Sequence, residues 1–178
     1  DYVFDGEASS PYVESCVTNP KSEYGLSKLN GELAILASDC QYLIIRTSWV
    51  FSEYGSNFMK TMLRVGSANV QLSIVDDQIG CPTYAQDLAR SIVCLLPRLI
   101  EPNSFSGIYH YCGNGECSWY DFAQVIFEKA RLRGFKVPDH IIPIKTAAYP
   151  TPARRPKYSS LNTDKFFIFI SSLYTLFM

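Results

Sequence analysis

Short apolar runs that alternate with helical patterns constrain the fold of this 178-residue chain more than any other feature. The runs expected to form strands are QYLIIRTSWVF at 41–51, VQLSIVDD at 70–77, GIYHYCG at 107–113 and HIIPI at 140–144. The segments expected to form helices are 20–37, 56–66, 83–96 and 118–133. Strands that alternate with helices of about ten or more residues are typical of a mainly parallel sheet covered by helices. The sequence therefore predicts an α/β fold.

Capping signals place the ends of several of these helices. Thr83 and Gln86 have the spacing of a capping box, and Ser118 is an expected N-cap. Gly66 and Gly134 are expected to end the helices that precede them, because glycine readily adopts the left-handed conformation found at helix C-termini.

The two ends of the chain differ from the rest. The opening DYVFDG, residues 1–6, is typical of the end of a buried strand that runs into a turn, so we expect the chain to be a fragment. The closing FFIFISSLYTLFM, residues 166–178, is almost entirely apolar. It is shorter than the roughly 20 residues that span a bilayer. We therefore expect a buried strand or an aberrant apolar tail there, and no membrane anchor.

Charge and cysteine usage argue against several classes of function. A net charge of −1 gives no electrostatic reason to bind nucleic acid or an anionic membrane. The six cysteines contain no C-x-x-C pair, and with two histidines in the chain a zinc site is not expected. Reduced, mostly buried thiols in a cytoplasmic protein are the expected state.

The segment SEYGLSKLNGELAIL holds the first candidate site. Its leucines recur at three- and four-residue steps and are expected to form the buried stripe of a helix: Leu26, Leu29, Leu33 and Leu36. Tyr24 and Lys28 are one turn apart on roughly the opposite face. An ammonium group one turn away stabilises a phenolate, so a tyrosine placed in this way can deliver a proton to a carbonyl oxygen.

The predicted topology brings this pair to a plausible ligand site. In an open parallel sheet, ligands bind beyond the carboxyl ends of the strands. Asp1–Gly6, the start of the Tyr24 helix and Thr47–Phe51 all fall at that edge. The Y-x-x-x-K spacing alone has little weight, because it arises by chance in a chain this rich in tyrosine.

The order of several motifs is more specific. DYVFDG, YGLSKLNGE and LIIRTSWVF, at this spacing, resemble the extended short-chain dehydrogenase/reductase superfamily. NFMKTMLR, VDDQIGCPT, GIYHYCGNGECSWYDFA and YPTPARRPKYSSLNT are similar to the dTDP-4-dehydrorhamnose reductase family, over about residues 1–165. The resemblance implies the C-terminal part of a Rossmann-type, doubly wound sheet together with a small α/β substrate lobe.

The resemblance also implies a division of the chain. Residues 1–52 and about 71–100 would be the remaining part of an NAD(P)-binding domain. About 53–70 and 101–165 would form the sugar-nucleotide lobe, followed by the apolar tail 166–178. Reduction of the 4-keto group of dTDP-4-dehydro-L-rhamnose by NADPH or NADH is the implied reaction, in a cytoplasmic enzyme that could be a homodimer and could use Mg²⁺.

Site residues carry over position by position. Tyr24 matches the proton donor, and Lys28 matches the residue that assists it and holds the nicotinamide ribose. The positions that match the substrate site are Asp1, Tyr2, Trp49, Asn57 with Phe58, and Arg155 with Arg154.

Structural explanations compete for several of these residues. Trp49 could be a core indole, Asn57 an ordinary helix start and Arg155 a solvated side chain. Asp76 and Asp77 are expected to form a structural turn. His110 lies in an apolar run and is expected to be a core residue with satisfied hydrogen bonds.

Two departures from the family pattern limit the prediction. First, no G-x-x-G-x-x-G loop occurs in the 178 residues, and the family's catalytic Ser or Thr would stand immediately before Asp1. Second, the family has a C-terminal helix after LNTDK, whereas residues 166–178 here lack a helical polar face. We therefore expect the chain by itself to bind NADPH poorly and not to turn over. Two alternatives remain: another nucleotide-sugar ketoreductase or epimerase, and a non-catalytic regulatory subunit of methionine adenosyltransferase.

Overall fold

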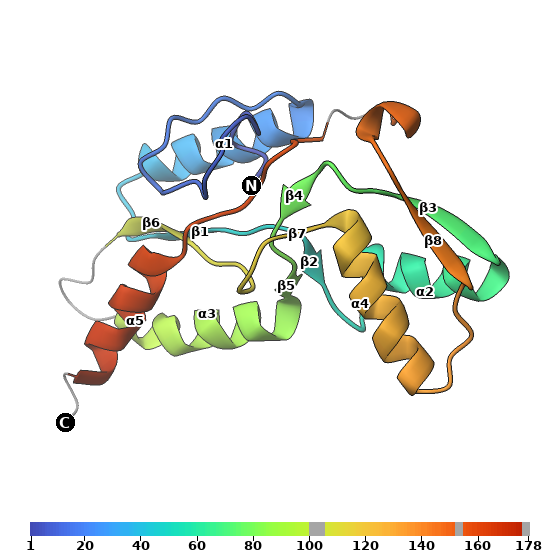
Figure 1. The fold of residues 1–178 in the computed structure, drawn as a ribbon. Helices are drawn as coiled ribbons and strands as arrows, with labels where there is room; N and C mark the ends of the chain where they lie inside the picture. The colour runs from blue at the N-terminus through green and yellow to red at the C-terminus, as the bar shows by residue number, and fades with distance from the viewer. Residues whose placement is uncertain (100–105, 152–154, 176–178) are drawn as a thin grey trace.

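The computed structural model describes residues 1–99, 106–151 and 155–175 and has the predicted mixed α/β architecture (Figure 1). Its helices are α1 (Glu23–Leu36), α2 (Phe58–Ala68), α3 (Ala85–Leu99), α4 (Trp119–Leu132) and α5 (Asp164–Thr175), with a short 3₁₀ turn η1 (Thr146–Ala148). Its strands are β1 (Leu43–Arg46), β2 (Val50–Phe51), β3 (Gln71–Val75), β4 (Ile79–Gly80), β5 (Thr83–Tyr84), β6 (Gly107–His110), β7 (Cys117–Ser118) and β8 (His140–Ile144).

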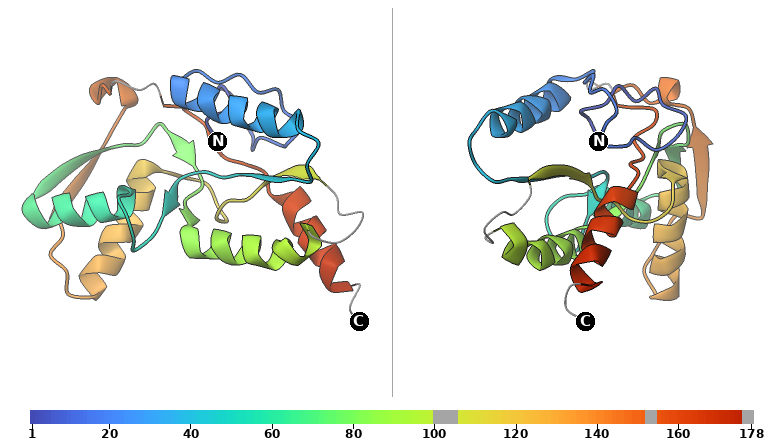
Figure 2. Two further views of the ribbon diagram at one scale, coloured as in Figure 1. Left: turned by 180° about the vertical axis from the view of Figure 1, so that it is seen from behind. Right: turned by 90° about the vertical axis from the view of Figure 1, so that its left-hand side faces the viewer.

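The strands pair mainly in parallel, as predicted. Strand β1 pairs with β6, β2 with β5 and β3 with β8, all in parallel, whereas β4 and β7 are antiparallel. Helix α1 lies on one side of the β1–β6 pair, and α3 and α5 lie on the other (Figures 1 and 2). Helices α2 and α4 lie with β3 and β8 at the other end of the molecule. The carboxyl end of β1 therefore points toward the region where these two parts meet.

The core of the β3–β8 end is apolar and centred on α4. Its buried members are Ile74, Phe122, Ala123, Ile126 and Phe127. Helix α2 packs closely against this cluster at Gly66, where a Cβ atom would lie 2.6 Å from the Phe127 ring. Gly66 is thus a packing residue inside α2, and the expected C-cap there is wrong, because the helix continues to Ala68. Close helix approach explains the glycine.

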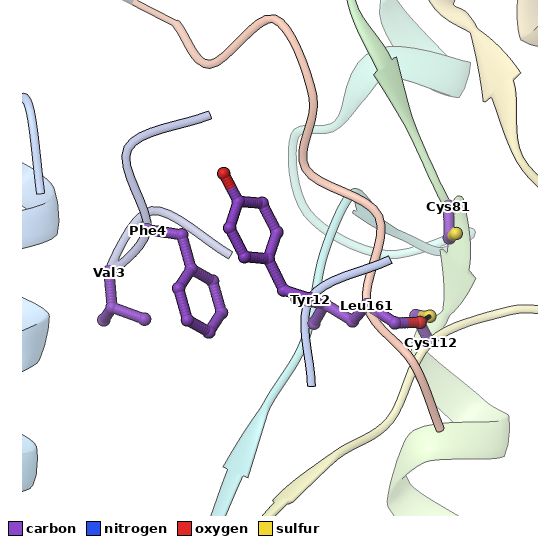
Figure 3. Packing of buried hydrophobic residues seen from close by; sticks show 6 residues of the cluster. All are labelled: Val3, Phe4, Tyr12, Cys81, Cys112 and Leu161. Carbon is purple, nitrogen blue, oxygen red and sulfur yellow. Dashed lines mark hydrogen bonds between the residues drawn. The ribbon is translucent and has the colours of Figure 1, made fainter. Parts of the chain in front are cut away.

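A second core joins the first residues to the middle of the chain. It contains Val3, Phe4, Tyr12, Cys81, Cys112 and Leu161 (Figure 3). The rings of Phe4 and Tyr12 stack with their centres 4.2 Å apart. The opening residues form a turn, in which the Phe4 amide donates to the Asp1 carbonyl at 3.1 Å, so the expected strand end is not formed. Burial of Phe4 and backbone bonds to Asn19 and Thr47, rather than strand pairing, hold this segment.

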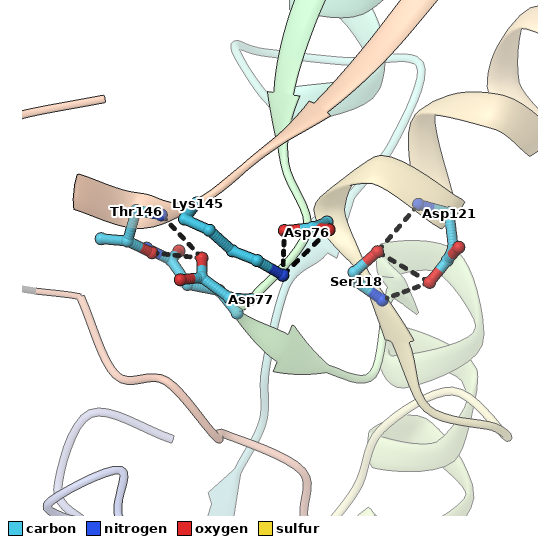
Figure 4. A network of polar contacts seen from close by, with 7 residues as sticks. Asp76, Asp77, Ser118, Asp121, Lys145 and Thr146 are labelled. Carbon is cyan, nitrogen blue, oxygen red and sulfur yellow. Dashed lines mark hydrogen bonds and ion pairs between the residues drawn. The ribbon is translucent and has the colours of Figure 1, made fainter. Parts of the chain in front are cut away.

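Two further boundaries differ from expectation. Thr83 lies in β5, where its hydroxyl donates to the Cys81 carbonyl, so no capping box forms with Gln86 and α3 begins at Ala85. The long run 41–51 is broken into β1 and β2. By contrast, the expected N-cap at Ser118 is confirmed, and a capping box with Asp121 completes it (Figure 4).

The apolar C-terminal segment forms the helix α5 and not a buried strand. Phe166 is fully buried against Leu95 and Tyr109, whereas Phe167 and Ile168 on the next positions are exposed. One side of the segment thus faces the core, which favours helix over strand. Within the described residues, no helix combines the length and apolar character needed to cross a membrane.

Helix α1 contacts the rest of the protein in an unexpected way. Leu26, Leu33 and Leu36 are exposed, so the expected buried leucine stripe is wrong at these positions. The buried residues of α1 are Gly25 and Glu32. A Cβ atom on Gly25 would lie 2.2 Å from the Tyr2 carbonyl oxygen, so the helix passes directly over the N-terminal turn.

A buried ion pair completes the contact of α1 with the sheet. Arg46, at the end of β1, donates from Nε and Nη2 to both Glu32 oxygens at 2.9 and 2.7 Å. His110 pairs with Arg46 across the strands, and its ring lies 3.5 Å from Arg46 Nη1. Bidentate geometry of this kind is among the strongest polar contacts in proteins. The position of α1 therefore depends on polar and backbone contacts more than on leucine packing.

Candidate functional site

Tyr24 and Lys28 lie near the start of α1 on an open surface. Tyr24 is 59% exposed, and Lys28 Nζ lies 5.2 Å from the centre of its ring. An ammonium group over a ring face is held there by the ring quadrupole. The Tyr2 ring meets Tyr24 edge-on, with the ring centres 5.3 Å apart. Tyr2 therefore connects the Tyr24–Lys28 pair to the interior.

A cavity of about 380 Å³ lies beside Tyr2, and we call it the Tyr2 cavity. Its walls come from the loop 2–7, from Lys21 and Ser22 before α1, from Gln78, and from the segments 146–151 and 155–157. Three cationic side chains line it, from Lys21, Arg155 and Lys157. Asp5 and Glu7 bring carboxylates to the same space. This mixture suits a polar ligand that carries negative charge.

A second cavity of about 400 Å³ adjoins the first, and we call it the Phe58 cavity. Its walls come from Phe58, Thr61 and Met62 of α2, from residues 73–75 of β3 and from Trp119 at the start of α4. Four residues line both cavities: Gln78, Tyr149, Thr151 and Arg155. Aromatic and apolar side chains with a few polar groups are the usual walls of a small-molecule site. Together the cavities can hold a ligand with one charged and one planar part.

Arg155 and Tyr2 both line the Tyr2 cavity, where the charge of Arg155 acts on the Tyr2 phenol. Burial raises the pKa of Tyr2, and the Arg155 guanidinium opposes that shift. Arg155 is exposed and lines both cavities. A guanidinium in this position can bind a diphosphate bidentately.

The relatives of the chain identify its family. The profile of the RmlD substrate binding domain matches residues 1–171. The chain belongs to this family. It is 45% identical over 170 residues to the dTDP-4-dehydrorhamnose reductase of Sinorhizobium fredii, and 41% identical over 167 residues to that of Escherichia coli K12. These alignments cover 93% of the chain but 56% of each relative, so the chain spans little more than half their length.

Solved structures of the same family have the same fold as this RmlD-family chain. A dTDP-4-dehydrorhamnose reductase from Bacillus anthracis, in complex with NADP, matches with a TM-score of 0.84 and 37% identity, over 94% of this chain and 56% of that one. The reductase from Clostridium acetobutylicum matches with a TM-score of 0.81 and 41% identity, over 98% and 56%. A UDP-glucuronic acid 4-epimerase from Bacillus cereus, at 18% identity and a TM-score of 0.63, shares the fold. The Rossmann-type class predicted from the sequence is confirmed.

Trp49 of this RmlD-family chain has the most unusual backbone at the site. Its φ of 46° is in the left-handed region, where bulky residues are rare and which is often associated with functional sites. Its indole stacks on Trp119 with the ring centres 3.5 Å apart and the planes 5° from parallel. Gly80 lies against the same indole, and a Cβ there would be 2.5 Å from it. Trp49 therefore reaches the Phe58 cavity through Trp119.

Two other predicted substrate residues have structural contacts. Asn57 is the N-cap of α2: its Oδ1 accepts from the Lys60 amide at 3.1 Å, and its Nδ2 donates to the Ser52 carbonyl at 2.7 Å. The amino group of Asp1 donates to the Thr47 carbonyl at 2.9 Å. The capping contacts account for Asn57 without a ligand, whereas the bond to Thr47 involves only the amino group of Asp1. Arg154 lies outside the described residues.

The remaining predictions about this region concern acidic residues and metals. Asp76 pairs with Lys145 Nζ at 3.0 Å, and Asp77 accepts from the amide and hydroxyl of Thr146 (Figure 4). Both carboxylates thus hold the segment that follows β8, as a structural turn requires. In the described part of the chain, no cluster of three or more potential metal-binding side chains occurs, so the expected Mg²⁺ gains no support.

Sequence reasoning missed three residues that shape the cavities. Gln78, Trp119 and Tyr149 line them, although none was singled out from the sequence. Gln78 and Tyr149 both lie in motifs that carry the family resemblance, VDDQIGCPT and YPTPARRP. These two motifs are the most specific to the family, and that specificity was the signal that could have identified Gln78 and Tyr149.

Proposed function

We propose that this chain forms the substrate-binding part of an enzyme that reduces dTDP-4-dehydro-L-rhamnose to dTDP-L-rhamnose with NADPH or NADH. The observation that carries this proposal is the Tyr2–Tyr24–Lys28 arrangement beside the Tyr2 cavity. Tyr24 and Lys28 do not line this cavity themselves, but the Tyr2 ring, which does line it, contacts the Tyr24 ring. The names of the curated relatives support the reductase and give no support to the methionine adenosyltransferase alternative.

The substrate is proposed to lie across both cavities. The thymine would occupy the Phe58 cavity, where Phe58 and Trp119 offer aromatic surface. The diphosphate would meet Arg155, which lines both cavities. The sugar would then extend into the Tyr2 cavity toward Tyr24, with Asp1, Trp49 and Asn57 as further candidate contacts.

The proposed proton transfer depends on Tyr24 and Lys28. A reduced nicotinamide, when bound, supplies hydride to the keto carbon. Tyr24 delivers its proton to the keto oxygen, and Lys28 stabilises the phenolate that this leaves. The exposed ammonium of Lys28 can also bind ribose hydroxyls, so the residues present fit the nicotinamide end of the cofactor. The pyrophosphate end has no glycine-rich loop within these 178 residues.

Two measurements test this proposal. The chain should bind dTDP in isothermal titration calorimetry, and Arg155→Gln should weaken that binding roughly tenfold, because a charge-assisted contact is lost. Lys136→Gln, which lines neither cavity, is the matched control. In a protein extended to the length of its relatives, Tyr24→Phe should abolish turnover with little change in substrate affinity. Undiminished turnover would remove Tyr24 from the mechanism.

A homodimeric assembly, a cytoplasmic location and the division of the chain into two lobes remain predictions from the sequence. The preference between NADPH and NADH is proposed to lie outside this chain, because the residue that senses the ribose 2′ position is normally in the first half of the fold.

A further inference from the structure

Gln78 stands at the centre of a hydrogen-bond chain that links the walls of both cavities. Its Oε1 accepts from Trp119 Nε1 at 3.1 Å, and its Nε2 donates to Thr146 Oγ1 at 3.0 Å. Thr146 Oγ1 in turn donates to Asp77 Oδ1 at 2.6 Å (Figure 4). Gln78 is 5% exposed, so its amide is held almost entirely by these protein partners.

The chemistry of the partners fixes the direction of every bond in this chain. Burial would raise the pKa of Asp77, but the bonds from the Thr146 hydroxyl and amide outweigh it and keep that pKa below its usual value. Asp77 is therefore an ionised acceptor, so the Thr146 hydroxyl donates its hydrogen bond to Asp77 and accepts one from Gln78. The indole nitrogen of Trp119 can only donate, so it must face the amide oxygen.

A flipped Gln78 amide is consequently excluded. It would set an N–H against the Trp119 N–H and a carbonyl oxygen against the Thr146 lone pairs, leaving buried groups unsatisfied. Trp119 is thus held by a directional bond at its nitrogen and by the stack on Trp49 at its ring. These two constraints determine the plane in which the indole lies.

We propose that Gln78 is a positioning residue for nucleotide recognition: it orients Trp119 so that the indole and Phe58 form the aromatic wall against which the base of a pyrimidine nucleoside diphosphate packs. This inference rests on the proposed function for its ligand. It assigns to Gln78 no contact with the reacting atoms. Its effect should therefore appear in the binding of the base and not in the binding of the diphosphate.

The experiment compares two probes and one spectroscopic signal on the 178-residue chain. The probes are dTDP and inorganic pyrophosphate, measured by titration calorimetry. The signal is the circular dichroism of the coupled Trp49–Trp119 pair, which is readily assigned because the chain has two tryptophans and Trp119→Phe removes it. Gln78→Leu removes both hydrogen bonds of the amide. Gln124→Leu is the matched control, because Gln124 lies on the exposed side of α4, the helix that carries Trp119.

Gln78→Leu should weaken the indole signal and lower the affinity for dTDP roughly five- to tenfold, while pyrophosphate affinity stays within about twofold. Gln124→Leu should change none of the three. Thr146→Val removes the bond from Gln78 and the hydroxyl bond to Asp77 but keeps the bond between Trp119 and Gln78, so it should have a smaller effect of the same kind. Gln78→Glu keeps the acceptor for Trp119 and should retain the indole signal.

Each contrary outcome has a distinct meaning. An unchanged indole signal in Gln78→Leu overturns the positioning role, whatever happens to binding. An equal loss for dTDP and pyrophosphate also overturns it, because that pattern is general damage to the site. If the unmodified chain binds no dTDP, the proposed function and the ligand part of this inference fail together, and the spectroscopic comparison alone then decides whether Gln78 orients Trp119.

Discussion

Helices α1 and α4 have the same length and similar N-caps but are held in different ways. Each has 14 residues and begins after a serine whose side chain accepts a backbone N–H. Helix α4 buries five residues: Phe122, Ala123, Ile126, Phe127 and Ala130. Helix α1 buries Gly25 and Glu32, while most of its leucines face outward. The comparison teaches that a helical apolar pattern locates a helix but does not decide which side of it is covered.

The two interfaces should respond differently to mutation. The α4 interface spreads its stability over many apolar contacts, each contributing by the area it removes from water. The α1 interface has fewer contacts: one bidentate ion pair, one close backbone approach, and the partly buried Leu29 packed against the second core. Removal of one partner from a buried pair leaves the other charge uncompensated.

The largest expected effect is at the centre of the α4 core. Phe127→Ala should lower the free energy of unfolding by about 3–5 kcal/mol, because a ring 4% exposed is replaced by a cavity between α2 and α4. Urea denaturation followed by circular dichroism measures it. Phe135→Ala removes an equal ring that is 58% exposed and should cost less than about 1 kcal/mol. Equal losses in both variants would show that this core is not packed as described.

The next effect tests the ion pair of α1. Arg46→Met should cost about 3 kcal/mol, because Glu32 is left buried without its partner. Adding Glu32→Leu should restore much of that stability, since two apolar side chains can replace a buried pair.

The control for this pair lies on the same helix. Leu33→Ala, at a position 52% exposed, should change the free energy of unfolding by less than about 1 kcal/mol. A loss in Leu33→Ala as large as that in Arg46→Met would mean that the leucine face, and not the ion pair, holds α1.

The smallest effect is a pH dependence that comes from His110, beside the same ion pair. Burial and the Arg46 guanidinium lower the pKa of His110 to about 4. Between about pH 6.5 and pH 4, His110 is protonated in the unfolded chain but neutral in the folded chain. The free energy of unfolding therefore falls as the pH falls through this range. The contribution of His110 to the free energy of unfolding should be about 2 kcal/mol lower at pH 5 than at pH 7.

Two variants isolate this contribution in urea titrations at pH 7, 6 and 5. His110→Gln should flatten the pH profile by that amount, whereas His140→Gln, at an exposed position, should leave it unchanged. Parallel profiles for His110→Gln and the unmodified chain would contradict the assignment.

Sequence reasoning was most successful where local chemistry decides the outcome. Ser118 caps the start of α4 and Gly134 follows its end, as expected. Both effects are local, because an N-cap hydroxyl bonds to an amide three residues away and a glycine at φ 77° turns the backbone where it stands. It failed where distant segments meet. Gly66 is surrounded by Phe127 and Pro138, and Thr83 bonds to Cys81 and Gly113, so neither is available for the capping role expected of it.

In the candidate site, too, features set by the local sequence were predicted and features set by distant contacts were not. Tyr24 and Lys28 could be paired from their spacing, because one helical turn sets their separation. Gln78 and Trp119 are 41 positions apart, and nothing in their local sequence indicates that one accepts a hydrogen bond from the other. The predicted substrate residue Arg155 lines both cavities, whereas Asn57 is engaged in capping α2.

The amino-acid sequence by itself determined the class of fold, the family and the placement of a phenol one turn from an ammonium group, because periodicity, capping and motif order are local properties. Tertiary structure alone decided that α1 rests on Glu32 and Gly25, that Trp49 stacks on Trp119, and that two cavities meet at Gln78. The physical reason is that burial and long-range hydrogen bonds depend on which segments meet in space, and the pattern within a segment does not contain that information.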